Sequence, residues 1–460
     1  MTAQEPLLTG HNVHSAAERQ AMLESIGASS IDDLFAQIPD SIRLQRPLQL
    51  PGPLSEWELE RKMRGLAARN ETTRTTLSFL GGGAYEHHLP AVLDALADRG
   101  EFLTAYTPYQ PEMSQGLLRY LLDFQTMLGR LLGRKAVNCS VYDGATALAE
   151  AAWMACCHQN RNRIVVSEAL WPDYLQVLET YMPGRGVEVV KVPLDPDTGQ
   201  IDLARAAKEL AIAPSAAFIV QTPNALGVIE PLADAIALAH EHGALANVSV
   251  NALLIGLTKS PGQLDADIVT CEAQPLGLPL NGGGPYLGVV ATREEMNHLL
   301  PGRIVGVCDD IKGEEALALI SEEREQHVSR DKATSHICSN QAWLALKVVI
   351  YLGWLGENGL HRLAELCAKK ARYLRNKLLE IPGVTPAASG EFFHEFALDL
   401  PVPAAEVLKT LQNKGIFGGI DLTDWPGGSS QRILIAVTET KNRADLDLAA
   451  ASFRAAIESA

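Results

Sequence analysis

Hydrophobic positions follow two different spacings over the middle of the chain. Short β-branched runs predict strands at 163–166, 187–192, 217–220, 244–248 and 267–270. Between them, apolar positions recur at helical spacing, as over 203–210 and 232–241, which predicts amphipathic helices. Strands that alternate with helices along a chain favour a mostly parallel sheet with helices on both faces. The pattern therefore predicts a large α/β domain over residues 76–330.

The pattern changes before and after this region. Residues 1–75 contain helical pieces around a proline-rich stretch, including a capping box that runs from Ser55 to Glu58. This arm has too little apolar pattern to fold alone, so we expect it to pack on the main body or on another subunit. After residue 330, two long helical stretches precede a strand–helix–strand pattern and a final helix. That order predicts a smaller α+β domain over residues 331–460.

Composition narrows the class of protein. The chain has 460 residues, 47% hydrophobic and 20% charged, which is typical of a globular protein. Its net charge of −16 argues against a general affinity for nucleic acid or anionic membranes. Apolar stretches such as 250–257 are far shorter than the roughly 20 residues of a membrane span, and the N-terminus lacks the pattern of a secretory signal. The seven cysteines are scattered without metal-ligand spacing, so we expect reduced thiols and a cytoplasmic protein.

One glycine-rich loop contains adjacent histidines. It covers Gly81–His88, and neighbouring histidines on one short segment cannot easily chelate a single metal ion. We therefore expect a flexible turn there and no metal site. The sequence also lacks the GxxxxGKS/T, GxGxxG, HExxH and GxSxG patterns, which disfavours the nucleotide sites and hydrolase sites that they mark.

A second loop is a candidate for anion binding. Gly144, Ala145 and Thr146 form a turn that runs into an alanine-rich helix. The free amides and the dipole of such a helix start suit a phosphate group. An ordinary helix start is the alternative. A third loop, the glycine run 281–288, follows a predicted strand and is weak evidence by itself, because glycines there only permit unusual backbone angles or close approach.

A fourth loop, residues 106–116, carries two tyrosines, two prolines and several amides before a predicted helix. Prolines stiffen such a loop and fix the directions of its side chains. A rigid surface loop without a ligand is the alternative, and periodicity alone cannot reject it. The side chains that we consider for ligand contact are Tyr106, Thr107, Tyr109, Gln110, Glu112 and Gln115.

The second, third and fourth loops belong to long ordered strings that are spread over nearly the whole chain. The strings are SIDDLFAQIP (30–39), FLTAYTPYQPEMSQG (102–116), YDGATALAEA (142–151), EAQPLGLPLNGGGPYLG (272–288), REQHVSRDKATSHICSNQ (324–341), GIFGGIDL (415–422) and IAVTET (435–440). Together they resemble the P-protein of the glycine cleavage system, glycine dehydrogenase (decarboxylating). Their order, and the lack of a second homologous half, resemble the family's separate alpha subunit.

The resemblance implies a fold, a cofactor and partners. The fold is the aspartate-aminotransferase-like fold type I of pyridoxal phosphate (PLP) enzymes, with a large mostly parallel-sheet domain and a smaller C-terminal α+β domain. The implied activity decarboxylates glycine and passes its aminomethyl group to the lipoyl arm of the H-protein, which makes the enzyme an oxidoreductase of the glycine cleavage system. The implied partners are a beta-type P-protein subunit and the lipoylated H-protein, in an α₂β₂ assembly.

Two positions decide which subunit carries the cofactor. PLP enzymes need a lysine for the Schiff base and usually an acid beside the pyridinium nitrogen. When the chain is matched to the family, the lysine position falls on Gln274 and the acid position near Asn251. An amide can form no imine, and a neutral Asn cannot stabilise a pyridinium. Lys259, in a turn, and Lys332, in an arginine-rich segment, are the nearest other lysines.

We therefore expect PLP on the beta-type partner and no covalent cofactor here, with this chain inactive alone. It would complete the partner's pocket through the 106–116 loop and help to fix the partner's phosphate through Thr334 and Ser335. Two alternatives remain open. One is an autonomous PLP enzyme of the same fold that uses an unrecognised lysine, and the other is a non-catalytic binding subunit with a different partner.

Overall fold

The computed structural model describes residues 13–44, 46, 48–103 and 106–460, and the chain divides into two units, Met1–Asn70 and Glu71–Ala460. The first unit contains helices α1 (Ala16–Ser25) and α2 (Glu56–Ala67) and the short η2 (Asp32–Phe35). The predicted capping box begins α2, since the Ser55 side chain accepts from the Glu58 amide. The N-terminal stretch assessed for a secretory signal falls largely on residues 1–12, outside the described residues, as do residues 104–105 of the 102–116 string.

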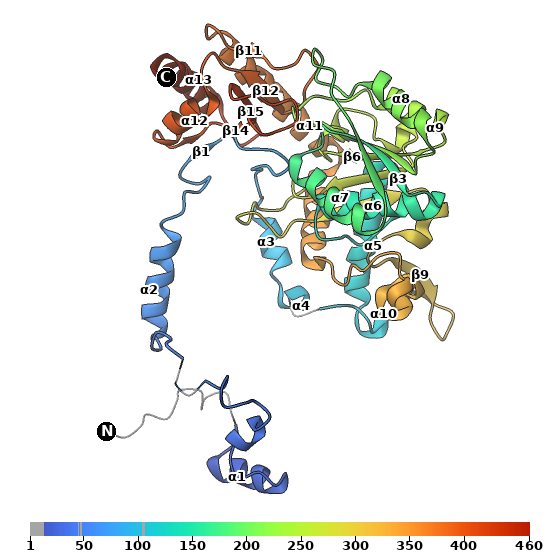
Figure 1. Ribbon diagram of the computed structural model, residues 1–460, viewed down its shortest axis with the longest axis vertical. Helices are drawn as coiled ribbons and strands as arrows, with labels where there is room; N and C mark the ends of the chain where they lie inside the picture. Colours follow the sequence, from blue (N-terminus) through green and yellow to red (C-terminus); the bar gives the residue numbers. More distant parts are fainter. Residues whose placement is uncertain (1–12, 45, 47, 104–105) are drawn as a thin grey trace. The chain divides into compact units, whose positions relative to one another are not determined.

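A seven-stranded sheet forms the centre of the second unit (Figure 1), with strand order β2-β8-β7-β6-β5-β3-β4. The neighbouring strands β4, β3, β5, β6 and β7 are parallel to one another. Strand β8 pairs antiparallel with both β7 and β2. The five predicted strands are all present, and β2 and β8 are additional. The strands are β2 (Ala136–Val137), β3 (Arg163–Ser167), β4 (Glu188–Val192), β5 (Ala217–Thr222), β6 (Leu245–Val250), β7 (Ile268–Glu272) and β8 (Gly288–Thr292).

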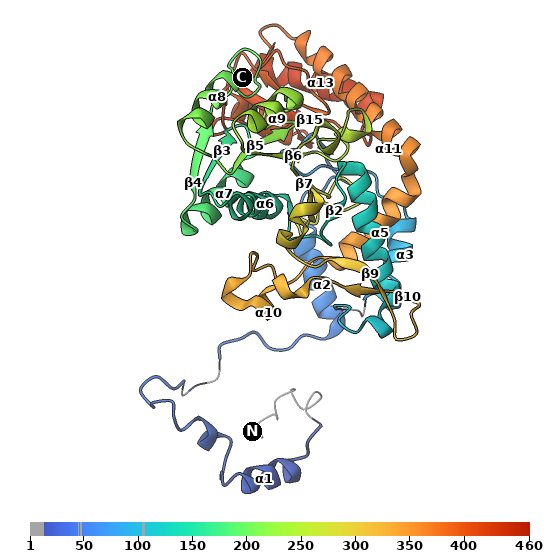
Figure 2. The same cartoon turned by 90° about the vertical axis from the view of Figure 1, so that its right-hand side faces the viewer.

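Helices cover both faces of this sheet (Figure 2). Side chains of a strand point to opposite faces in turn, so Ile164 and Val166 join one core while Val165 joins the other. The first core includes residues of α6 (Gly144–Gln159) and α7 (Pro172–Gly184). The second core includes residues of α5 (Gln115–Leu132), α8 (Leu203–Ile212) and α9 (Leu232–Glu241). The predicted layered α/β fold is confirmed.

A smaller antiparallel sheet with order β11-β12-β15-β14 follows near the C-terminus. Its strands are β11 (Thr385–Pro386), β12 (Glu395–Asp399), β14 (Ile420–Asp421) and β15 (Arg432–Ala436). Helices α12 (Ala404–Gln412) and α13 (Arg443–Ser459) share a core with it. Strand β1 (Leu77–Ser78) pairs in parallel with β13 (Ile416–Phe417), so the start of the second unit is fixed to its C-terminal part.

The two helices expected at 341–354 and 360–379 are both present. They are the two parts of α11 (Ala342–Leu379), which is interrupted at Gly356, where φ is 61° and ψ is 179°. A hairpin of β9 (Val305–Asp309) and β10 (Glu315–Leu319) was not predicted. No helix among the described residues is long and apolar enough to cross a membrane.

Candidate functional site

The carboxyl edge of the large sheet brings two predicted site segments together. Strand β7 ends at Glu272, two residues before Gln274, and α6 begins beside it at Gly144. The Gly144 amide donates to Glu272 Oε2 over 2.9 Å. Ligands of open α/β sheets bind outside the carboxyl ends of the strands, so this is the expected place for a site.

Gln274 is fully buried, and its side-chain amide is saturated by main-chain groups. Its Oε1 accepts from the Tyr85 amide at 2.9 Å, and its Nε2 donates to the Tyr85 and Leu278 carbonyls, also at 2.9 Å. The predicted lysine position is therefore occupied by a carboxamide that ties the 81–88 loop to the sheet.

Glu272 is a buried carboxylate bound by backbone amides. Besides Gly144, the amides of Gln274 and Leu287 donate to its Oε1 at 2.9 Å each. Burial raises the pKa of Glu272 to about 7, although the three amides oppose that rise. The Tyr174 hydroxyl packs directly against Gly144, because a Cβ added at Gly144 would lie 2.0 Å from the Tyr174 Oη.

Asn251, at the predicted acid position, follows β6 and is 5% exposed. Its Oδ1 accepts from the Leu253 amide at 3.0 Å, so the side chain caps its own loop. The side chain is neutral and carries no charge that could hold a pyridinium proton.

The residues at this edge do not fit covalently bound PLP. Gln274 offers no amine, and Asn251 offers no carboxylate. In the first turn of α6, Glu272 holds the Gly144 amide and the Asp143 side chain accepts from the Thr146 amide at 2.7 Å. The anion seat expected at residues 144–146 is thus occupied in part by carboxylates of the chain itself. Lys259 and Lys332 are both exposed.

The 106–116 loop is fastened to the body through Tyr109 and Gln115. The Tyr109 hydroxyl accepts from Arg303 Nη2 at 3.1 Å, and the Arg303 guanidinium lies 5.5 Å from the Tyr109 ring centroid. Gln115 donates to the Leu317 carbonyl and accepts from the Leu317 amide on β10. Gln115 therefore supports the loop, although it is exposed, as are Tyr106, Gln110 and Glu112.

Thr334 and Ser335 lie apart from the α6 start, beside the middle of that helix. The Thr334 carbonyl accepts from Trp153 Nε1 at 2.9 Å. Ser335 is buried, and its hydroxyl accepts from the Ile337 amide at 3.2 Å. Burial raises the pKa of the nearby Glu150 carboxyl, against the opposing effects of Ser335 and Arg185. Thr334 and Ser335 also line a small cavity of about 10 Å³, roughly one water, together with His298, Leu300, Gly302, Arg324, Glu325 and Ile337.

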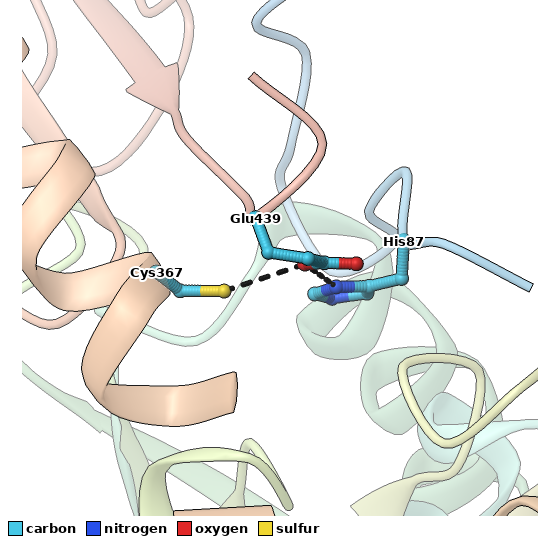
Figure 3. Close-up of side chains that lie close together, drawn as sticks. All are labelled: His87, Cys367 and Glu439. Carbon is cyan, nitrogen blue, oxygen red and sulfur yellow. Dashed lines mark hydrogen bonds and ion pairs between the residues drawn. The ribbon is translucent and has the colours of Figure 1, made fainter. Parts of the chain in front are cut away.

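A buried cluster that the sequence did not reveal surrounds His87 (Figure 3). His87 Nδ1 lies 2.7 Å from Glu439 Oε2, and Cys367 Sγ donates to the same oxygen at 3.5 Å. Burial would raise the pKa of Glu439. The hydrogen bond with His87, the charge of His87 and the hydrogen bond from the His88 amide instead hold that pKa at about 2. The three side chains are of the types that bind zinc, but here they hydrogen-bond one another. Because they come from segments far apart in sequence, ligand spacing could not have found them.

Comparison with known proteins matches nearly the whole chain to one family. A family model described as the glycine cleavage system P-protein matches residues 9–453. A "probable glycine dehydrogenase (decarboxylating) subunit 1" from Moorella thermoacetica is 45% identical over 440 residues, covering 96% of this chain and 98% of the relative. A protein of the same description from Thermomicrobium roseum is 43% identical over 435 residues, covering 94% of this chain and 96% of that relative.

Solved structures agree with the sequence comparison. The crystal structure of a glycine decarboxylase (P-protein) of the glycine cleavage system, in inhibitor-bound form, superposes with a TM-score of 0.86 at 38% identity. The match covers 97% of this chain and 99% of that chain. A sphingosine-1-phosphate lyase of Burkholderia pseudomallei has the same fold, with a TM-score of 0.68 at 15% identity over 92% of this chain and 95% of the lyase.

Proposed function

Because the chain belongs to the glycine cleavage system P-protein family, whose fold is the aspartate-aminotransferase-like fold type I, we propose that it is the lysine-free subunit of a two-subunit glycine decarboxylase. The relatives are described as subunit 1, which supports a heteromeric enzyme with a second subunit. The reaction would release the carboxylate of glycine as CO₂ and transfer the aminomethyl group to the lipoyl arm of the H-protein.

One observation carries the assignment of roles. Gln274 lies at the expected lysine position and is fully buried, and its side-chain amide is hydrogen-bonded to the main chain of Tyr85 and Leu278. On this proposal a beta-type partner would provide the lysine and hold the PLP, which would supply the electron sink for decarboxylation. This chain would act on the partner's pocket from outside.

The 106–116 loop is the segment best prepared for such a contribution. Tyr109 is about half exposed, and Arg303, which is 5% exposed, fixes its hydroxyl. A side chain that is fixed at its tip loses little conformational freedom when a partner's substrate arrives, which favours precise positioning. Tyr106, Thr107, Gln110 and Glu112 would line the same rim for glycine or the lipoyl arm, and Thr334 and Ser335 would stand near the partner's phosphate.

Reconstitution tests the proposal. The chain is expressed with a lysine-bearing P-protein subunit, and exchange of the glycine carboxyl with bicarbonate is measured for the pair and for each subunit in the presence of H-protein and PLP. We expect exchange from the pair and none from this chain alone. Borohydride reduction followed by peptide mapping should place the cofactor on a lysine of the partner.

Two outcomes would contradict the proposal. A borohydride-trapped lysine within this chain would instead support an autonomous PLP enzyme. Equal exchange by the partner with and without this chain would support a binding subunit outside glycine metabolism, and a pull-down that lacks a P-protein partner would agree with that result.

A further inference from the structure

Glu272 binds three segments of the large domain through one carboxylate. Its Oε2 accepts from Gly144 at the start of α6, and its Oε1 accepts from Gln274 after β7 and from Leu287 before β8. The residue is only 7% exposed. A carboxylate removed from water is costly unless polar groups replace its hydration, and here backbone amides do so.

The charge lies where a helix most favours an anion. Helix α6 is 16 residues long, and its first-turn amides and dipole create a positive end. Asp143 accepts from the Thr146 amide, and Glu272 accepts from the Gly144 amide. The two carboxylates thus do what a bound oxyanion would do at an open helix start.

The surrounding side chains keep Glu272 in place. Glycine at 144 is required, because an added Cβ would meet the Tyr174 hydroxyl at 2.0 Å and the Glu272 Cβ at 3.0 Å. Gln274 contributes two different groups here: its main-chain amide donates to Glu272, and its side-chain amide donates to the Tyr85 carbonyl. The closing of the helix start and the replacement of the lysine are therefore parts of one hydrogen-bonded arrangement.

We propose that Glu272 is a built-in anion that stands in for the phosphate of a cofactor at the start of α6, closing this chain's own cofactor seat and joining the helix to the β7 and β8 ends. Truncation of Glu272 leaves three unpaired amides around an anion-sized space. Such a seat takes a tetrahedral oxyanion, with inorganic phosphate as the simplest probe.

The test compares Glu272→Ala with Glu230→Ala in the full-length chain. Glu230 is a matched control, because it is also a buried carboxylate that accepts a backbone amide, from Ile201 at 2.9 Å, but it does not bind a helix start. Thermal and urea unfolding are measured in phosphate and in chloride at equal ionic strength. Phosphate stabilises folded proteins generally, and wild type and Glu230→Ala should share this gradual, non-saturating effect. We expect an additional, saturable stabilisation by phosphate in Glu272→Ala alone.

A second variant guards against failure of Glu272→Ala to fold. At pH 8, above the Glu272 pKa of about 7, Glu272→Gln keeps the shape but removes the charge and turns a donor toward backbone donors, so its folding equilibrium constant should fall roughly tenfold to hundredfold. The proposal is overturned if folded Glu272→Ala responds to phosphate no more than Glu230→Ala. It is also overturned if Glu272→Ala does not fold and Glu272→Gln is as stable as wild type. Neither measurement involves decarboxylation, so failure here leaves the assigned subunit function untouched.

Discussion

The side chain of Gln274 and the main chain of Tyr85 form a closed pair of hydrogen bonds, with Oε1 accepting from the amide and Nε2 donating to the carbonyl at 2.9 Å each. The pair spans 189 residues of sequence and is fully inside the protein. An amide side chain can satisfy a main-chain donor and a main-chain acceptor at once, so Gln274 is suited to this structural role.

Truncation of Gln274 should therefore destabilise the chain. Gln274→Ala leaves the Tyr85 amide and two carbonyls without partners, and each unsatisfied buried group costs about 1–3 kcal/mol. We expect the free energy of unfolding to fall by roughly 2–4 kcal/mol in urea titrations. Gln412→Ala at the exposed end of α12 is the control and should change it by about 0.5 kcal/mol or less. Equal effects of the two substitutions would show that the Gln274–Tyr85 hydrogen bonds do not contribute measurably to the free energy of unfolding.

Tyr109→Phe should lower glycine–bicarbonate exchange by the reconstituted pair without unfolding this chain. The change removes the hydroxyl that accepts from Arg303 but keeps the ring beside the guanidinium. A loss of about 1 kcal/mol of positioning corresponds to a roughly fivefold decrease in kcat/KM. Tyr373→Phe, which removes a hydroxyl bonded to Asp447, is the control. Unchanged kinetics for Tyr109→Phe would remove this residue from the proposed rim.

Stability should fall as pH rises from about 4.5 to 7, in part through Glu395. Burial raises the pKa of Glu395 to about 7, against the effects of the Gly82 amide and the Tyr85 hydroxyl. The folded state then keeps a proton that the unfolded state releases, so the free energy of unfolding decreases with pH by at most about 1.4 kcal/mol per unit for this group. Glu395→Gln should reduce that slope in urea titrations between pH 4.5 and 7, whereas the exposed Glu391→Gln should not. An identical slope in all three proteins would refute this role.

The His87–Glu439 pair makes an opposite contribution in acid. The pKa of Glu439 is about 2 in the folded state, below its ordinary value of 4.5, so the stability from this pair is present above pH 4.5 and is lost as pH falls toward 2. Glu439→Gln should cost about 1–3 kcal/mol at pH 7 and flatten the acid limb of the stability curve. Glu357→Gln, on the exposed surface of α11, serves as control and should leave that limb in place. A steep acid limb in Glu439→Gln would show that other carboxyls produce it.

The sheet could be predicted because its central strands carry continuous apolar runs. Arg163–Ser167 and Ala217–Thr222 are buried on both faces, and such runs contrast clearly with the helical spacing between them. The run Gly288–Thr292 is equally buried but directly follows the glycine loop, and the two-residue β2 is too short for any period. The β9–β10 hairpin is half exposed, so its apolar signal is weak.

One property of the candidate site follows from residue identity alone. Gln274 cannot form an imine wherever its side chain points, so the sequence sufficed for that conclusion. The partners of the side chains were not predictable, since Tyr85 reaches Gln274 and His87 reaches Glu439 across 189 and 352 residues. Nothing in the run Cys271–Gln274 indicated that Glu272 would turn back onto the helix start at Gly144.

The contacts of Glu272 and Gln274 bear on how the assembled enzyme would depend on its cofactor. On the proposal that these side chains close this chain's own cofactor seat, the chain would reach its folded form without any vitamin B6 derivative. Scarcity of the vitamin would then limit active enzyme only through the lysine-bearing partner, while this protein would accumulate undiminished and stay ready for assembly.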